Sequence, residues 1–130
     1  MDNDTNPGRL AASVLEGVAF ALREGLQVLK EAGTAIGSLA VVGGGARSRD
    51  WGSIIASALS VRLHYLAGGE VGPALGAARL AQMAVTGATA AEVCTRPPIS
   101  HVIDPDPELT ERLTRKFVRF QAASAAVRAL

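Results

Sequence analysis

Three consecutive glycines, Gly43 to Gly45, stand between an apolar run and a helical pattern. The run over residues 38–42 is partly β-branched and predicts a buried strand. Glycines allow a backbone to approach a ligand closely, and the first turn of the following helix offers free N–H groups and a positive dipole end. This strand–turn–helix unit can hold a nucleotide, although the same turn can also serve only to pack a helix on a strand.

Two better-known phosphate motifs do not fit this turn. The pattern Gly-x-x-x-x-Gly-Lys-Ser/Thr is absent, because no lysine follows these glycines. Gly43-x-Gly45-x-x-Ser48 resembles a dinucleotide fingerprint with serine in place of the third glycine. That fingerprint also requires an acidic residue at the end of the second strand, where this sequence has Leu66 and Ala67. A small dinucleotide-binding domain therefore remains an alternative, but the sequence has no acidic residue at the position that would bind the ribose.

The chain has one cysteine, Cys94, and two histidines, His64 and His101, far apart in sequence. A single cysteine excludes an internal disulfide and suits a reducing cytoplasm. The spacing of these three residues is not that of a structural zinc site. We interpret Cys94 as an ordinary small apolar residue, His64 as lying on or beside a strand, and His101 as part of a solvated loop.

Composition limits the classes of protein to which the chain can belong. Its 130 residues suit one domain, and a hydrophobic share of 48% is enough for a core. Lys and Arg number 13 against 12 Asp and Glu, so nothing favours nucleic acid as a partner. No apolar run approaches the ~18 residues of a membrane span, and the polar start lacks a secretory pattern.

Helices and strands alternate around the glycine turn. Gly17 and Gly25 lie inside the first expected helix and weaken it by ~1 kcal/mol each relative to alanine, so we expect another element to pack closely there. The apolar residues at helical spacing in this helix are Leu10, Val14, Leu15, Val18, Leu22, Leu26 and Leu29. The expected elements are a helix over 10–31 that can begin at Asn6-Pro7, the strand over 38–42, a helix opening at Ser48 or Asp50, a strand over 61–66, a helix from Pro73 to about Gly87, a short helix in a capping box of Thr89 and Glu92, an irregular crossing over 95–105, and a last helix from Asp106.

Two strands joined through a helix are expected to be parallel. A two-stranded parallel sheet is not a stable unit, because parallel sheets need cover and neighbours and both strands would have open edges. We infer that the two strands belong to a larger sheet, whose other strands come from a preceding region, another copy or a separate chain.

Residues 43–48, with the sequence Gly-Gly-Gly-Ala-Arg-Ser, and the following Trp51 resemble the adenosine-binding motif of FGGY carbohydrate kinases, especially the xylulokinase-like branch. Residues 14–23 resemble the helix before that motif, and residues 74–81 resemble the helix after it. With Pro105-Asp106-Pro107 and the last helix, the resemblance covers almost the whole chain from Leu10.

The resemblance implies an α/β fold. Members of the family have two lobes of the actin-like, ribonuclease-H-like type, and this sequence resembles only the later half of the C-terminal lobe. The implied order is α-β-α-β-α plus C-terminal helices, with two parallel strands that would be the last two of a five-stranded sheet. Residues 1–9 would form a polar tail, and residues 10–130 a partial nucleotide-binding domain.

The resemblance also implies which residues bind ATP. Gly44, Gly45 and Ala46 would line the adenine and ribose through main-chain atoms, because a side chain would obstruct the base. Ser48 would cap the helix or touch the nucleotide. Arg49 stands where relatives often have an adenine-contacting polar residue, frequently asparagine, and arginine can stack on a base.

Other matched positions have mainly structural interpretations. Trp51 would be a wall of the pocket or an anchor of its helix in the core. Gly76 and Ala77 would permit close packing of a helix on the sheet, while Glu16 and Glu70 would cap or form surface pairs. Ala12 departs from the family, since many relatives have arginine there.

The implied function is ATP binding, with Mg²⁺ in the intact enzyme, and phosphoryl transfer to a ketopentose such as xylulose or a related polyol. The family's Asp-x-Gly-Thr phosphate hairpin, its catalytic aspartate and its sugar pocket are not in this chain. We therefore expect the chain to be inactive alone. The alternative is a non-catalytic interaction module that self-associates as a homo-oligomer or docks to a separate chain with the missing lobe.

Overall fold

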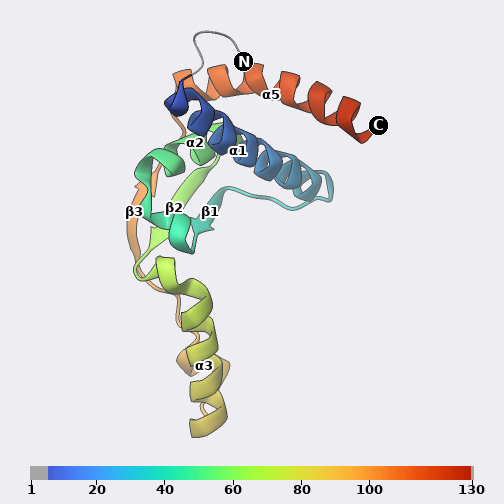
Figure 1. Ribbon diagram of the computed structural model, residues 1–130. Helices are drawn as coiled ribbons and strands as arrows, with labels where there is room; N and C mark the ends of the chain where they lie inside the picture. The colour runs from blue at the N-terminus through green and yellow to red at the C-terminus, as the bar shows by residue number, and fades with distance from the viewer. Residues whose placement is uncertain (1–5, 130) are drawn as a thin grey trace.

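The computed structural model describes residues 6–129 of the chain (Figure 1). The order of helices and strands agrees with the sequence pattern except for one additional strand. The elements are α1 (Pro7–Glu31), β1 (Ser38–Val41), the 3₁₀ turn η1 (Gly44–Arg47), α2 (Arg49–Leu59), β2 (Arg62–Leu66), the 3₁₀ turn η2 (Gly69–Val71), α3 (Gly72–Thr86), α4 (Ala90–Val93), β3 (Ile99–Ile103) and α5 (Pro107–Arg128).

The strands form one mixed sheet in the order β1-β2-β3. β1 and β2 are parallel, in register from Ser38↔Arg62 to Val41↔Tyr65, and α2 connects them as expected. β3 is antiparallel to β2. The central strand β2 therefore has partners on both sides, whereas β1 and β3 each leave one edge of the sheet unpaired.

We expected an irregular crossing over residues 95–105. This prediction is wrong for the middle of the segment, because Ile99–Ile103 form β3. Pro97 and Pro98 precede this strand and Pro105 follows it, so no proline interrupts its hydrogen bonds. Proline beside an edge strand is compatible with pairing, since it removes no donor from the ladder. The solvated loop expected for His101 is wrong for the same reason.

Three helices, α1, α2 and α5, pack together beside the sheet (Figure 1). Their common core contains Phe20 of α1, Leu59 of α2, and Leu113 and Phe117 of α5. The rings of Phe20 and Phe117 lie 5.6 Å apart. The Arg23 guanidinium lies 4.4 Å from the centre of the Phe117 ring, and burial lowers the pKa of Arg23. Leu113 and Phe117 of α5 are thus buried within the chain.

A second cluster joins α2 to the sheet through Ala56, Leu63 and Tyr65. Gly52 of α2 lies where the helix comes closest to the strands. A Cβ atom on Gly52 would overlap Tyr65 Oη and lie 2.7 Å from Ile103 Cδ1. Glycine is therefore required for this close approach of helix and sheet.

α3 and α4 extend away from the sheet as an arm (Figure 1). No residue of α3 is buried, and the Leu80 and Val85 side chains are 67% and 87% exposed. The close packing on the sheet expected at Gly76 and Ala77 is wrong, since both are exposed and nothing lies within 4 Å of a Cβ position on Gly76.

The packing of another element expected at Gly17 and Gly25 is also absent among the residues that the structure describes. A Cβ atom at either position would meet nothing within 4 Å. Of the seven apolar residues that predicted α1, only Leu26 is buried. Most of the apolar surface of α1 is therefore uncovered.

α1 begins at Pro7, and Asn6 caps it by accepting a hydrogen bond of 2.9 Å from the Arg9 N–H. Residues 1–5 of the expected polar tail lie outside the described residues. From residue 6 to residue 129, no helix combines the length and the hydropathy that a membrane crossing requires.

Candidate functional site

The glycine turn connects β1 to α2 at the carboxyl end of β1. Gly43 has a φ of 88°, a conformation that favours glycine. Gly44–Arg47 then form one 3₁₀ turn, and Ser48 begins α2 by accepting a 3.2 Å hydrogen bond from the Trp51 N–H. The expected cap at Ser48 is confirmed.

A second glycine turn lies against the first. The Gly43 N–H donates a 2.9 Å hydrogen bond to the Gly69 carbonyl, which follows β2. Gly68 has a φ of 70°, and a Cβ atom on Gly69 would lie 3.2 Å from the Val41 carbonyl oxygen. The turns after the two parallel strands are therefore held side by side, at the edge where ligands bind in open α/β sheets.

The structure leaves most of the predicted adenosine-binding residues accessible. Gly44, Gly45, Ser48 and Arg49 are exposed, whereas Ala46 is half-buried and packs against the second cluster. A Cβ atom on Gly44 would meet nothing within 4 Å. A flat ligand can therefore reach the main chain of Gly44 and Gly45 without displacing protein atoms.

Trp51 lies at the border between this turn and the interior. Its indole Cδ1 and Nε1 atoms lie 3.4 Å from a Cβ position on Gly45. The half-buried ring also packs against the core that α1, α2 and α5 share. Trp51 is thus an anchor of α2 in the core, and it also supports the glycine turn from behind.

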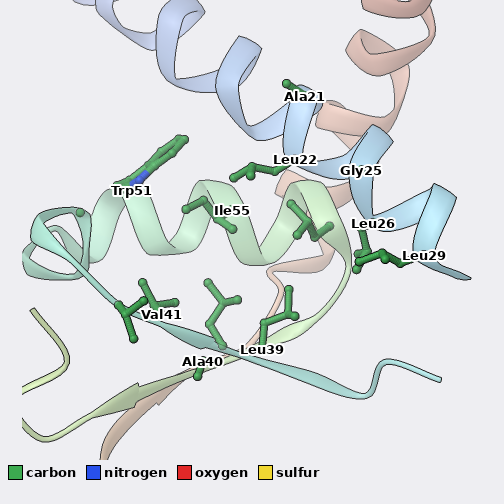
Figure 2. A pocket seen from close by; sticks show the side chains of 14 residues that line it. Ala21, Leu22, Gly25, Leu26, Leu29, Leu39, Ala40, Val41, Trp51 and Ile55 are labelled. Carbon is green, nitrogen blue, oxygen red and sulfur yellow. The ribbon is translucent and has the colours of Figure 1, made fainter. Parts of the chain in front are cut away.

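Behind the turn lies a hollow of about 730 Å³ between α1, α2 and β1. Figure 2 shows Leu22 and Leu29 of α1 directed toward it, with Leu39 and Ile55 on other sides. Leu22 and Leu29 were predicted only as part of a helical stripe. The signal that marks them is the excess of apolar residues in α1, more than one buried face requires.

Positive charge surrounds the glycine turn. Arg47 and Arg49 are exposed on either side of Ser48, next to the N-terminus of α2 with its positive dipole end. Asp50 in the first turn of α2 offsets part of this charge. Within residues 6–129, no group of three or more His, Cys, Asp or Glu side chains is placed to hold a metal ion.

Outside the glycine turn, His101 and Glu16 make contacts within the fold. His101 stacks on Tyr65 with ring centres 4.2 Å apart, and its Nδ1 lies 3.2 Å from Ser100 Oγ. Glu16 pairs with Lys116 at 2.7 Å, the surface pair that was expected for it. Cys94 is exposed rather than packed as a small apolar side chain.

The sequence matches a model of the C-terminal domain of the FGGY family of carbohydrate kinases over residues 1–85. It is 50% identical over 78 residues to a xylulose kinase of Escherichia coli, and 35% identical over 81 residues to one of Bacillus subtilis. These matches cover 60% and 62% of this chain but only 16% of either relative.

Solved structures match the whole fold. A xyloylose kinase from Brucella ovis superposes on 99% of this chain with a TM-score of 0.83 and 40% identity. A xylulose kinase from Rhodospirillum rubrum also covers 99% of it, with a TM-score of 0.76 and 30% identity. The chain accounts for only 27% and 26% of those two proteins.

Proposed function

Because the chain belongs to the FGGY family of carbohydrate kinases and matches its C-terminal domain, we propose that it is the adenosine-binding portion of an ATP-dependent sugar kinase. Its α/β fold is part of the actin-like ATPase fold of the xylulose kinases that it superposes on. The proposed binding residues are Gly44, Gly45, Ala46, Ser48 and Arg49.

The observation behind this proposal is the exposed, unobstructed main chain of the glycine turn. Gly44 and Gly45 are exposed at the carboxyl edge of the sheet, and nothing lies within 4 Å of a Cβ position on Gly44, while the Trp51 ring packs against Gly45. Arg49 beside them supplies a planar cation that can stack on a purine. Main-chain contacts and stacking suit the adenosine half of ATP.

The phosphates and the sugar require other parts of a kinase. Phosphoryl transfer depends on positioning and on charge stabilisation by magnesium and by groups around the phosphates. The given sequence has no Asp-x-Gly-Thr hairpin, the segment that grips the phosphates in the family that it resembles. We therefore propose that the chain binds ATP weakly and is inactive until the remaining parts of the enzyme are supplied.

An ATP titration tests the nucleotide-binding role. Trp51 is the only tryptophan in the chain and lies against Gly45, so its fluorescence is expected to change when a base covers the turn. ATP is added with Mg²⁺ to the chain alone, and to the chain with a Brucella ovis kinase fragment that lacks the matched quarter and whose tryptophans are replaced by phenylalanine. No binding in either case would contradict the proposal.

Gly44→Val identifies the binding face. The valine side chain would have open space around it, and Gly44 does not have the positive φ that side chains disfavour. The fold is therefore expected to persist while ATP binding weakens at least tenfold. Gly37→Val is the matched control, because Gly37 also has open space but lies before β1. Equal ATP affinity in both variants would place the nucleotide elsewhere.

The acceptor that we propose is a ketopentose, with xylulose first, because the curated relatives are xylulose kinases. The combined chain and fragment are assayed for ATP-dependent phosphorylation of xylulose, with ribulose and glycerol as comparison acceptors. Transfer to glycerol in preference to either ketopentose would contradict this choice.

The second candidate function is that of an interaction module that self-associates or joins a complementing chain. The uncovered apolar surface of α1 and the unpaired edge of β1 favour it. It is compatible with the first, since a kinase in two pieces would need both. We propose the cytoplasm as the location, because the lone cysteine suits a reducing compartment.

A further inference from the structure

The glycine turn, residues 43–47, has few features of its own that fix its shape. It begins with three consecutive glycines, and glycine has more backbone freedom than any other residue type. Gly44 and Gly45 are exposed, and a Cβ atom on Gly44 would meet nothing within 4 Å. The main chain that we propose for adenosine binding therefore depends on its neighbours for a defined conformation.

Gly43 connects this turn to the rest of the sheet. Its φ of 88° and ψ of −177° lie in a region that essentially only glycine adopts. The Gly43 N–H donates the 2.9 Å hydrogen bond to the Gly69 carbonyl, and the Gly43 carbonyl accepts one of 3.0 Å from the Ala46 N–H. These two hydrogen bonds link Gly69 to the 3₁₀ turn that contains Gly44 and Gly45.

Gly69 belongs to a segment with a support of its own. We call this segment, residues 67–71, the second turn. The Ala67 N–H donates a 2.9 Å hydrogen bond to the Pro98 carbonyl, in the chain that leads into β3. Gly69 itself is buried. The second turn is therefore tied to the rest of the fold and can hold the glycine turn in position.

The second turn lies directly against the end of β1. A Cβ atom on Gly69 would lie 3.2 Å from the Val41 carbonyl oxygen, and one on Gly72, at the start of α3, would lie 3.3 Å from the Val42 Cβ. Gly69 does not have a positive φ, so the short distance rather than the backbone conformation favours glycine there. A side chain at residue 69 is therefore expected to push the second turn away from β1 and to lengthen the hydrogen bond to Gly43.

We propose that Gly69 is a positioning residue for nucleotide binding. Through Gly43, it holds the main chain of Gly44 and Gly45 in the conformation that receives adenosine. Because Gly69 is buried, it acts through its hydrogen bond rather than by contact with the ligand. A turn that is ordered before binding loses less conformational freedom on binding, and the affinity rises accordingly. This inference rests on the proposed function, to which it adds a residue outside the proposed binding set.

Amide exchange in the unaltered chain measures the hold on the glycine turn without any substitution. The Gly43 N–H is hydrogen-bonded to the second turn, whereas Gly44 follows it at the exposed start of the 3₁₀ turn. We expect the Gly43 amide hydrogen to exchange with solvent at least tenfold more slowly than that of Gly44. Nuclear magnetic resonance resolves the two amides, and equal exchange rates would overturn the proposal.

Gly69→Val tests whether this hold sets the affinity for ATP. Valine at residue 69 lacks room beside β1, so we expect it to speed the exchange of the Gly43 amide and to weaken ATP binding at least tenfold. Gly76→Val is the matched control, because Gly76 lines a neighbouring hollow of about 180 Å³ and nothing lies within 4 Å of its Cβ position. It is expected to change both quantities less than twofold.

Circular dichroism confirms that each variant is folded. Gly69→Ala, with an expected threefold effect on ATP affinity, replaces Gly69→Val where the valine variant does not fold. The change in Trp51 fluorescence on addition of ATP and Mg²⁺ measures the affinity, for the chain alone and with the Brucella ovis fragment. Faster Gly43 exchange with unchanged affinity would overturn the proposal. Weaker affinity with unchanged exchange would do the same, and so would a variant that changes neither.

The unaltered chain separates this inference from the nucleotide-binding role. If it binds ATP neither alone nor with the fragment, the proposed function is contradicted and the positioning role falls with it. If it binds ATP with the same affinity as the folded Gly69→Val protein, only the positioning role is contradicted.

Discussion

Gly52 shows how one residue type decides the distance between a helix and a sheet. No other residue type fits where α2 meets Tyr65 and Ile103. We predict that Gly52→Ala lowers the free energy of unfolding by about 1–3 kcal/mol, since the added methyl group overpacks a filled contact. Urea unfolding followed by circular dichroism measures this change.

Gly25→Ala provides the matched control for that substitution. Its methyl group meets open space within a helix, so the variant is expected to gain up to about 1 kcal/mol. Adding Tyr65→Phe to Gly52→Ala should restore part of the lost stability by removing the overlapping hydroxyl. A Gly52→Ala protein as stable as the parent would contradict the packing described.

Tyr65 is predicted to make the protein sensitive to alkali. Its side chain is 3% exposed, its hydroxyl has no hydrogen-bond partner in the described residues, and burial raises its pKa. Tyr65 ionises near pH 10 in the unfolded chain and stays neutral in the folded one, so its contribution to stability is constant below about pH 10 and is lost as the pH rises above it. Unfolding in urea across this pH range tests the slope.

Tyr65→Phe is the control for the alkaline effect. It removes the chain's only tyrosine and is expected to flatten the slope above pH 10 in that range. It should cost little stability at neutral pH, because the hydroxyl that it removes forms no hydrogen bond. An unchanged alkaline slope would assign the effect to other groups.

The individual residues differ in how well the sequence predicts them. The cap at Ser48 follows from a short-range pattern and is confirmed. The contact of Gly52 with Tyr65 and Ile103 joins three segments far apart in the chain, and no local pattern contains that information. The role of Gly44, Gly45 and Arg49 in nucleotide binding stays a prediction.

Among the elements, the sequence predicts those whose signals are local. Strands β1 and β2 and the starts of α2 and α5 have an apolar run or a capping residue, and all are confirmed. β3 was missed because three prolines dominate its surroundings, although Ile99, Val102 and Ile103 are β-branched. Its pairing depends on β2, which lies more than thirty residues away.

The start of α5 allows a prediction about capping. Asp106 accepts a 2.7 Å hydrogen bond from the Leu109 N–H, and Pro107 follows at the first helical position. Asp106→Ala is expected to lower the free energy of unfolding by about 1 kcal/mol. Asp104→Ala, which breaks only an exposed pair with Arg62, should lower it by about 0.5 kcal/mol or less. Equal losses in thermal unfolding would contradict the cap.

For the whole molecule, local stability is expected to differ between the packed helix α2 and the helix α3. α2 contributes to both clusters of buried residues, whereas α3 has no buried residue and extends away from the sheet. We predict that amide hydrogens of α3 exchange with solvent much faster than those of α2. Mass spectrometry of deuterium uptake tests this, and equal protection of the two helices would contradict it.

The need for a further strand was inferable from the sequence, because two parallel strands cannot stand alone. The strand that pairs with the other side of β2 is β3 of this same chain, not one from a preceding region, another copy or a separate chain as we expected. The apolar surface left on α1 also has a signal in the sequence, since the helix has more apolar residues than one buried face requires, but that signal does not identify which of them stay exposed. The fold of the described residues thus has a well-packed part, at α2 and α5, and an uncovered part beside β1.

The hydrogen bond between the Gly43 N–H and the Gly69 carbonyl has a practical consequence for building chimeras. It ties together two loops that are more than twenty residues apart in the sequence. Exchanging one loop with that of a homologue would leave its counterpart shaped for a different neighbour. Recombination breakpoints should therefore fall before Gly43 and after Gly69, so that both loops come from the same parent protein.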